Sequence, residues 1–153
     1  MTKLPDGQLV RFHAYLEPDR QWVIGHANES HNGYGPAVLR PLAGYNDRTT
    51  AWQVDYRNDD QFRLRWAESP NLYLGIGSRN DAMRLTAEPT FIEGPMCLFT
   101  IDDLNPSPWF ALNNWDHSRV ADIRRSDMHD GNDVIGFPWN GGDNQKWRYE
   151  VVN

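Results

Sequence analysis

The chain has 153 residues, the length of one domain, and its single cysteine, Cys97, excludes an internal disulfide framework and a four-cysteine zinc site. Its formal net charge of −6 argues against a nucleic-acid partner, because phosphate contacts require a basic surface. No apolar run approaches the roughly 18 residues of a membrane span, and residues 1–7 contain no apolar segment of the secretory type. We therefore expect no membrane insertion and a cytoplasmic location.

Short segments rich in β-branched and aromatic residues alternate with turns along the whole chain. Twelve Gly and ten Pro interrupt it too often for a long helix, and no apolar pattern of helical period persists. Closely spaced short strands of this kind are typical of an all-β barrel or sandwich. In chain order, the predicted strands cover residues 9–12, 21–24, 37–39, 52–56, 61–66, 72–74, 83–85, 98–101, 109–112, 119–121, 134–137 and 147–151.

The twelve predicted strands fall into three similar groups of four. Trp52, Phe99 and Trp147 occupy matching positions in the last strand of each group, and they are 47 and 48 residues apart. One such unit cannot bury its own apolar face, so three units must close on one another. We predict a β-trefoil domain over residues 1–153, with repeats at approximately 7–58, 59–105 and 106–153.

The third repeat resembles those of the ricin B-type (R-type) lectins. In that family each repeat ends in Gln-x-Trp, here Gln145-Lys146-Trp147, which follows the turn Asn140-Gly141-Gly142-Asp143. The resemblance covers the whole chain as a three-repeat plan, and its motif is clear in the third repeat. The chain resembles the small cytosolic lectins of mushrooms and the trefoil haemagglutinin components of bacteria, and the resemblance implies that Trp147 belongs to the core.

The resemblance also implies a sugar site in the third repeat. Asp122 matches the carboxylate that accepts hydroxyl groups, Asn144 the amide near it, and Gln145 the neighbouring support. Phe137 matches the aromatic ring that packs on the sugar, with Trp139 as a rival. The alternative is that Asp122 is a turn residue and that the two amides only close the last turn.

The first two repeats depart from this pattern. Gly25 and Gly75 stand in the place of the carboxylate, and Thr49-Thr50 and Met96-Cys97 in the place of the amide pair. Pro41 stands where the first repeat should carry the aromatic ring. Since glycine offers no acceptor, we predict one sugar site per chain, so that multivalent binding requires a homodimer.

A polar and aromatic loop follows the second predicted strand. Its residues His26, Asn28, His31 and Tyr34 form a candidate secondary ligand site, and the alternative is a solvated loop. The spacing of the two histidines suits neither a helical zinc motif nor a zinc finger. We predict no metal and no cofactor.

Catalytic patterns are weak. Asp116-His117-Ser118 places three triad residue types side by side, but sequence neighbours rarely adopt the geometry of a triad. We therefore predict a non-catalytic lectin. The alternative is a protein-interaction β-trefoil, either a protease inhibitor or a companion subunit of an enzyme. Galactose or N-acetylgalactosamine is the ligand that the family implies, and the departure at Phe137-Pro138-Trp139 adds mannose to the candidates.

Overall fold

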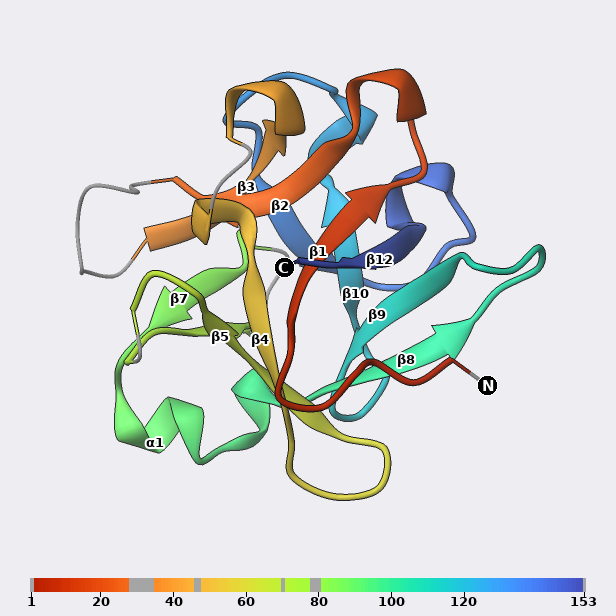
Figure 1. Cartoon of the computed structure of the whole chain (residues 1–153). Coiled ribbons are helices and arrows are strands. Elements are labelled where there is room, and N and C mark those ends of the chain that lie inside the picture. Colours follow the sequence, from red (N-terminus) through yellow and green to blue (C-terminus); the bar gives the residue numbers. More distant parts are fainter. Residues whose placement is uncertain (1, 28–34, 46–47, 70, 78–80, 153) are drawn as a thin grey trace.

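The computed structural model contains twelve short strands and describes residues 2–27, 35–45, 48–69, 71–77 and 81–152 (Figure 1). One short α-helix, α1 (Pro89–Ile92), lies between the seventh and eighth strands. Within the described ranges, no helix is long and apolar enough to cross a membrane. The strands are β1 (Leu9–Ala14), β2 (Trp22–His26), β3 (Gly35–Pro41), β4 (Trp52–Tyr56), β5 (Phe62–Trp66), β6 (Tyr73–Gly75), β7 (Arg84–Thr86), β8 (Phe99–Asp103), β9 (Phe110–Asn114), β10 (Val120–Ile123), β11 (Val134–Phe137) and β12 (Trp147–Val151).

Six of these strands close into a barrel. The antiparallel pairs β1–β4, β4–β5, β5–β8, β8–β9, β9–β12 and β12–β1 form a continuous ring, so that every barrel strand has two neighbours. The remaining strands form the hairpins β2–β3, β6–β7 and β10–β11. Closure removes the exposed sheet edges on which strands of other chains can pair. This arrangement is a β-trefoil of three four-stranded repeats, as predicted.

The strand registers align the three repeats residue by residue. Trp52 of β4 pairs with Trp66, Phe99 of β8 with Asn114, and Trp147 of β12 with Ala14. The first residue of each closing strand therefore occupies the same position in the barrel. All three of these aromatic side chains are fully buried.

The indole groups of the closing strands also bind the hairpins. The Trp52 Nε1–H donates to the Ile24 carbonyl at 3.0 Å, and the Trp147 Nε1–H donates to the Ala121 carbonyl at 3.0 Å. Phe99 has no such donor in the second repeat. These bonds fix β2 and β10 against the barrel, directly before the positions of Gly25 and Asp122.

Candidate functional site

A buried carboxylate and two amides meet in the third repeat. Asp122 lies on β10, while Asn144 and Gln145 lie on η6 (Asp143–Gln145), a 3-10 turn that leads directly into β12. Asp122 Oδ1 accepts from Asn144 Nδ2 at 3.0 Å, and Asp122 Oδ2 accepts from Gln145 Nε2 at 2.8 Å. Each carboxylate oxygen therefore has one amide donor and keeps further acceptor capacity.

Gln145 uses its whole amide inside the protein. Its Nε2 donates to Asp122 and to the Pro138 carbonyl at 3.0 Å, and its Oε1 accepts from the Asn140 backbone N–H at 2.9 Å. The side chain is fully buried. Gln145 therefore orients the carboxylate and holds the backbone on both sides of Trp139, so it is a positioning residue.

Asn144 is half-buried, and one polar atom of its amide is available to a ligand. Its Nδ2 donates both to Asp122 and to the Ile123 carbonyl at 3.0 Å. In this rotamer the amide contributes an acceptor, Oδ1, and no donor to a ligand. A Cβ placed on Gly142 would lie 2.5 Å from Asn144 Oδ1 and 2.9 Å from Asn140 Oδ1, so a larger residue here would displace these side chains.

Two aromatic side chains accompany the carboxylate. Across the β10–β11 hairpin, Ile135 pairs with Asp122 and Phe137 pairs with Val120. Residues two apart on a strand point to the same face, so Phe137 is a diagonal neighbour of Asp122. Phe137 is half-buried, whereas the Trp139 side chain is 44% exposed in the loop held by Gln145.

Burial and the neighbouring polar groups act in opposite directions on the pKa of the Asp122 carboxyl. Burial raises the pKa of the Asp122 carboxyl above its ordinary value, against the lowering effects of the Gln145 amide, the Arg124 guanidinium and the Asn144 amide. An isolated buried carboxylate is costly, and hydrogen bonds to its charged form offset part of that cost. The two amides therefore keep an acceptor available at this position.

Arg40 fills the corresponding space in the first repeat. Gly25 pairs with Val38, as Asp122 pairs with Ile135, so the counterpart of Phe137 is Arg40 and the assignment to Pro41 is wrong by one residue. A Cβ on Gly25 would lie 3.0 Å from Arg40 Cγ. The first repeat therefore has neither the carboxylate nor the space for one.

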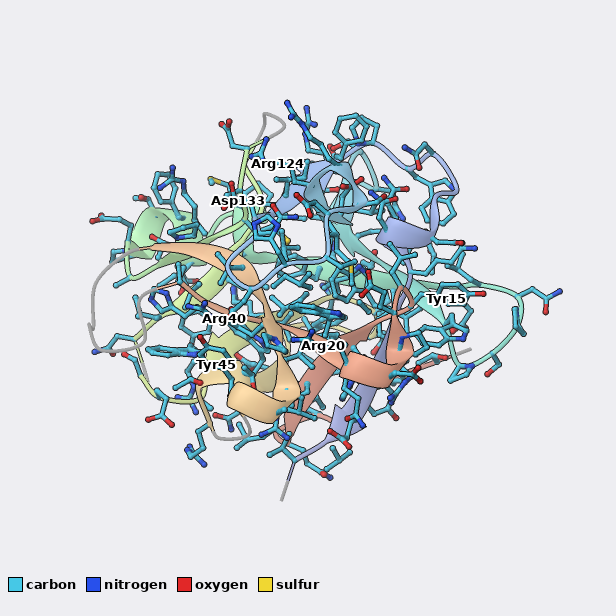
Figure 2. The ribbon with its side chains drawn as sticks, turned by 90° about the horizontal axis from the view of Figure 1, so that it is seen from above. Tyr15, Arg20, Arg40, Tyr45, Arg124 and Asp133 are labelled. Atoms are coloured by element: carbon cyan, nitrogen blue, oxygen red, sulfur yellow. The ribbon has the colours of Figure 1, made fainter. Side chains whose placement is uncertain are left out.

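A contact between the first and third repeats holds Arg40 in place. Its Nη1 donates to Asp130 Oδ1 at 2.8 Å, and its guanidinium lies 4.6 Å from the centroid of the Tyr45 ring (Figure 2). The Tyr45 hydroxyl donates to Asp130 Oδ2 at 3.1 Å. Sequence reasoning missed this cluster because its partners are far apart along the chain.

The second repeat has the same backbone pairing and 3-10 turn as the third, but it lacks the carboxylate and the two amides. Gly75 pairs with Arg84 on β7, and Met96-Cys97 ends the 3-10 turn η4 (Pro95–Cys97) before β8. A Cβ on Gly75 would lie 3.3 Å from Cys97 Sγ. Burial raises the pKa of the Cys97 thiol to about 11, so this thiol is neutral and unreactive near neutral pH.

The predicted secondary loop site lies mostly outside the described residues, which exclude Asn28, His31 and Tyr34. His26 ends β2, is fully buried, and packs edge-to-face on Trp66 with the ring centroids 4.7 Å apart. A Cβ on Gly35 would lie 2.6 Å from the His26 ring. The His26 ring is therefore packed between Trp66 of the barrel and the backbone at Gly35.

Other polar groups in the described parts of the chain serve local structure. Asp116 Oδ1 accepts from the Ser118 backbone N–H at 3.0 Å, while His117 contacts Asp102 at 3.3 Å, so the three triad residue types form a turn. Within the same described ranges, no group of three or more His, Cys, Asp or Glu side chains is arranged to hold a metal ion.

The chain is similar in structure to known β-trefoil proteins. No family model and no curated protein sequence matches it. A designed three-fold symmetric protein, ThreeFoil, superposes with a TM-score of 0.79 at 17% identity, covering 94% of this chain and 99% of that one. The Rhizoctonia solani agglutinin (TM-score 0.76, 18% identity) covers 99% of each chain. The ricin B-like lectin of Macrolepiota procera, in complex with lactose (TM-score 0.73, 16% identity), covers 99% of this chain and 100% of that one.

The same fold also occurs within larger proteins. This chain spans 18% of a mosquitocidal holotoxin, with a TM-score of 0.81 at 17% identity. It spans 31% of an exo-β-1,3-galactanase from Clostridium thermocellum, with a TM-score of 0.80 at 14% identity. The chain thus has the β-trefoil fold of the ricin B-like lectins.

Proposed function

We propose that the protein is a non-catalytic carbohydrate-binding β-trefoil with one sugar site in the third repeat. The observation that carries the proposal is the Asp122 carboxylate, held by one amide donor on each oxygen beside Phe137. In this site Asp122 accepts hydrogen bonds from adjacent sugar hydroxyls, and Asn144 Oδ1 accepts a third. Phe137 and Trp139 provide apolar surfaces for the C–H face of the sugar ring.

The chemistry of the site suits a neutral polyhydroxylated ligand. Hydrogen bonds to an ionised acceptor are stronger than those between neutral groups, and each hydroxyl of a sugar is a donor. The solved complex of the Macrolepiota procera lectin with lactose supports a glycan as ligand. Galactose or N-acetylgalactosamine is the first candidate, and mannose is the second.

We propose that the other two repeats bind no sugar in this manner. In the first repeat Arg40 takes up the space beside Gly25, and in the second the counterparts of the amide pair are Met96 and Cys97. One site per chain makes a monomer univalent. Pairing of two chains would raise avidity through effective concentration, without any new contact to the sugar.

The test is calorimetric titration of the wild-type protein and the Asp122→Ala variant with lactose, N-acetylgalactosamine and mannose. Loss of the acceptor leaves hydroxyl donors unpaired, which costs about 1–3 kcal/mol, or roughly 5- to 150-fold in affinity for the sugar that binds best. Asp19→Ala, at an exposed carboxylate on the 3-10 turn Pro18–Arg20 of the first repeat, is the matched control and should bind as the wild type does. Equal affinity of Asp122→Ala and the wild type would refute the site.

A papain-inhibition assay separates this proposal from its alternative. The alternative is a protein-interaction β-trefoil, acting as a protease inhibitor or as a companion subunit of an enzyme. Inhibition of papain by the wild-type protein, combined with no binding to any of the three sugars, would replace the proposed function with this alternative.

A further inference from the structure

The second repeat contains a groove of about 600 Å³ where the third repeat holds Asp122. Gly75, the counterpart of Asp122, forms part of its wall together with Met96 and Cys97, the counterparts of the two amides. Volumes of this order are typical of small-molecule sites, which are concave and mostly apolar. The groove is open to solvent and therefore accessible to a ligand.

The lining of the groove is predominantly apolar. Leu85 and Cys97 are fully buried, and Ala82 and Met96 are half-buried. Phe91, on α1, is 43% exposed, and solvent-facing aromatic surface of this kind gains free energy when a ligand covers it. Gly75 and Gly77 contribute no side chains to the groove.

The charged groups at the groove have both signs. Arg84 is exposed and makes no ion pair within the described residues, while Asp81 and Glu88 are exposed carboxylates on the same lining. Among the described lining residues neither sign of charge dominates, and the chain has a net charge of −6, so an anionic ligand gains no general attraction. The electrostatics therefore favour an uncharged ligand.

The apolar surface is too localised for an extended protein interface. Among the described residues, the other exposed large apolar side chains are Trp115, Trp139 and Val151, and none of them lines the groove. Docking surfaces for proteins are usually contiguous apolar patches of several hundred Å². One exposed aromatic ring, that of Phe91, at the mouth of the groove suits a small ligand that enters the groove.

We infer that the second repeat binds an uncharged, apolar organic molecule with one or two rings, at a site separate from the sugar site. Such a ligand would lie between Phe91 and Met96, above the space left by Gly75 and Gly77. The groove thus lies at the position in its repeat that corresponds to the sugar site, and its lining suits an apolar ligand instead of a polyhydroxylated one.

The direct test uses N-phenyl-1-naphthylamine, an uncharged fluorescent probe, with Gly77→Leu and Gly44→Leu variants. A Cβ on Gly77 would approach only Met96 Cε, at 3.9 Å, so leucine fits there and fills the groove. A Cβ on Gly44, outside the groove, would meet nothing within 4 Å, which makes Gly44→Leu the matched control.

We expect saturable one-to-one binding by the wild type and by Gly44→Leu, and at least a tenfold loss of affinity in Gly77→Leu. Melting temperatures of the three proteins must agree, because partly unfolded chains also bind such probes. Equal affinity of Gly77→Leu and wild type would overturn the inference, as would the absence of saturable binding.

Two further measurements distinguish other occupants. The anionic analogue 8-anilinonaphthalene-1-sulfonate should bind more weakly than the uncharged probe, and tighter binding would contradict the proposed ligand class. Self-association of the wild type that is abolished by Gly77→Leu would assign the groove to a second copy of the chain instead. Asp122→Ala should leave probe binding unchanged, which separates this inference from the proposed sugar site.

Discussion

Replacement of Trp147 by alanine should destabilise the fold, because Trp147 is a core residue and is not itself a sugar-contacting group. The Trp147 side chain is fully buried, and its Nε1–H bonds the Ala121 carbonyl directly before Asp122. Truncation of a core tryptophan costs about 3–5 kcal/mol, a large part of the roughly 5–15 kcal/mol that stabilises a typical domain. At about 2–4 °C per kcal/mol for a chain of this size, the melting temperature should fall by about 6–20 °C.

Trp139→Ala is the matched control, because its indole is 44% exposed and belongs to the candidate site. Substitutions of exposed residues usually change stability by no more than about 0.5 kcal/mol, so this variant should melt within about 2 °C of the wild type. Its sugar affinity should fall, since an apolar surface of the site is lost. Thermal unfolding followed by circular dichroism, with calorimetric sugar titration below the transition, measures both effects. An unchanged melting temperature in Trp147→Ala would refute its assignment to the core.

Three further predictions concern a carboxyl group, a thiol and a glycine. The pKa of Asp122 is raised in the folded state, so just above pH 3.8 the folded chain binds more protons than the unfolded chain, and the stability contributed by Asp122 falls as the pH rises. Urea titrations of wild type and Asp122→Asn between about pH 4 and pH 6 should show that the stability of the wild type relative to the variant decreases with pH. An increase in that relative stability with pH would contradict the prediction. Cys97, with its pKa raised to about 11, should not react with Ellman's reagent in the native protein at neutral pH and should react fully in denaturant; rapid native reaction would show that the thiol is accessible. Gly142→Ala should weaken sugar binding by displacing Asn144, while Gly44→Ala should not, as titration of both variants will show.

The fold could be predicted because its signal is repeated three times. Each repeat provides four short apolar segments, and an aromatic residue recurs at Trp52, Phe99 and Trp147. All twelve predicted strands are present, and their limits differ by a few residues where backbone pairing extends beyond the apolar run. The strand predicted at 37–39, for example, covers Gly35–Pro41 in the structure.

The side chains and the groove at the sugar-site positions of the first two repeats could not be predicted in the same way. The role of Arg40 depends on its bond to Asp130, 90 residues away, which no local pattern records. Its alignment with Phe137 depends on hairpin register, and a shift of one residue moves a side chain to the other face of a strand. The groove beside Gly75 arises from missing side chains and from the placement of Phe91 by α1, so no positive motif marks it.

The central claim is that the third repeat alone binds sugar in the R-type manner, and a crystal structure with the preferred sugar tests it most directly. We predict ligand density beside Asp122, Phe137 and Asn144, with a sugar hydroxyl within hydrogen-bonding distance of the carboxylate. Equivalent sugar density beside Gly25 or Gly75, or a sugar bound away from Asp122, would contradict the account.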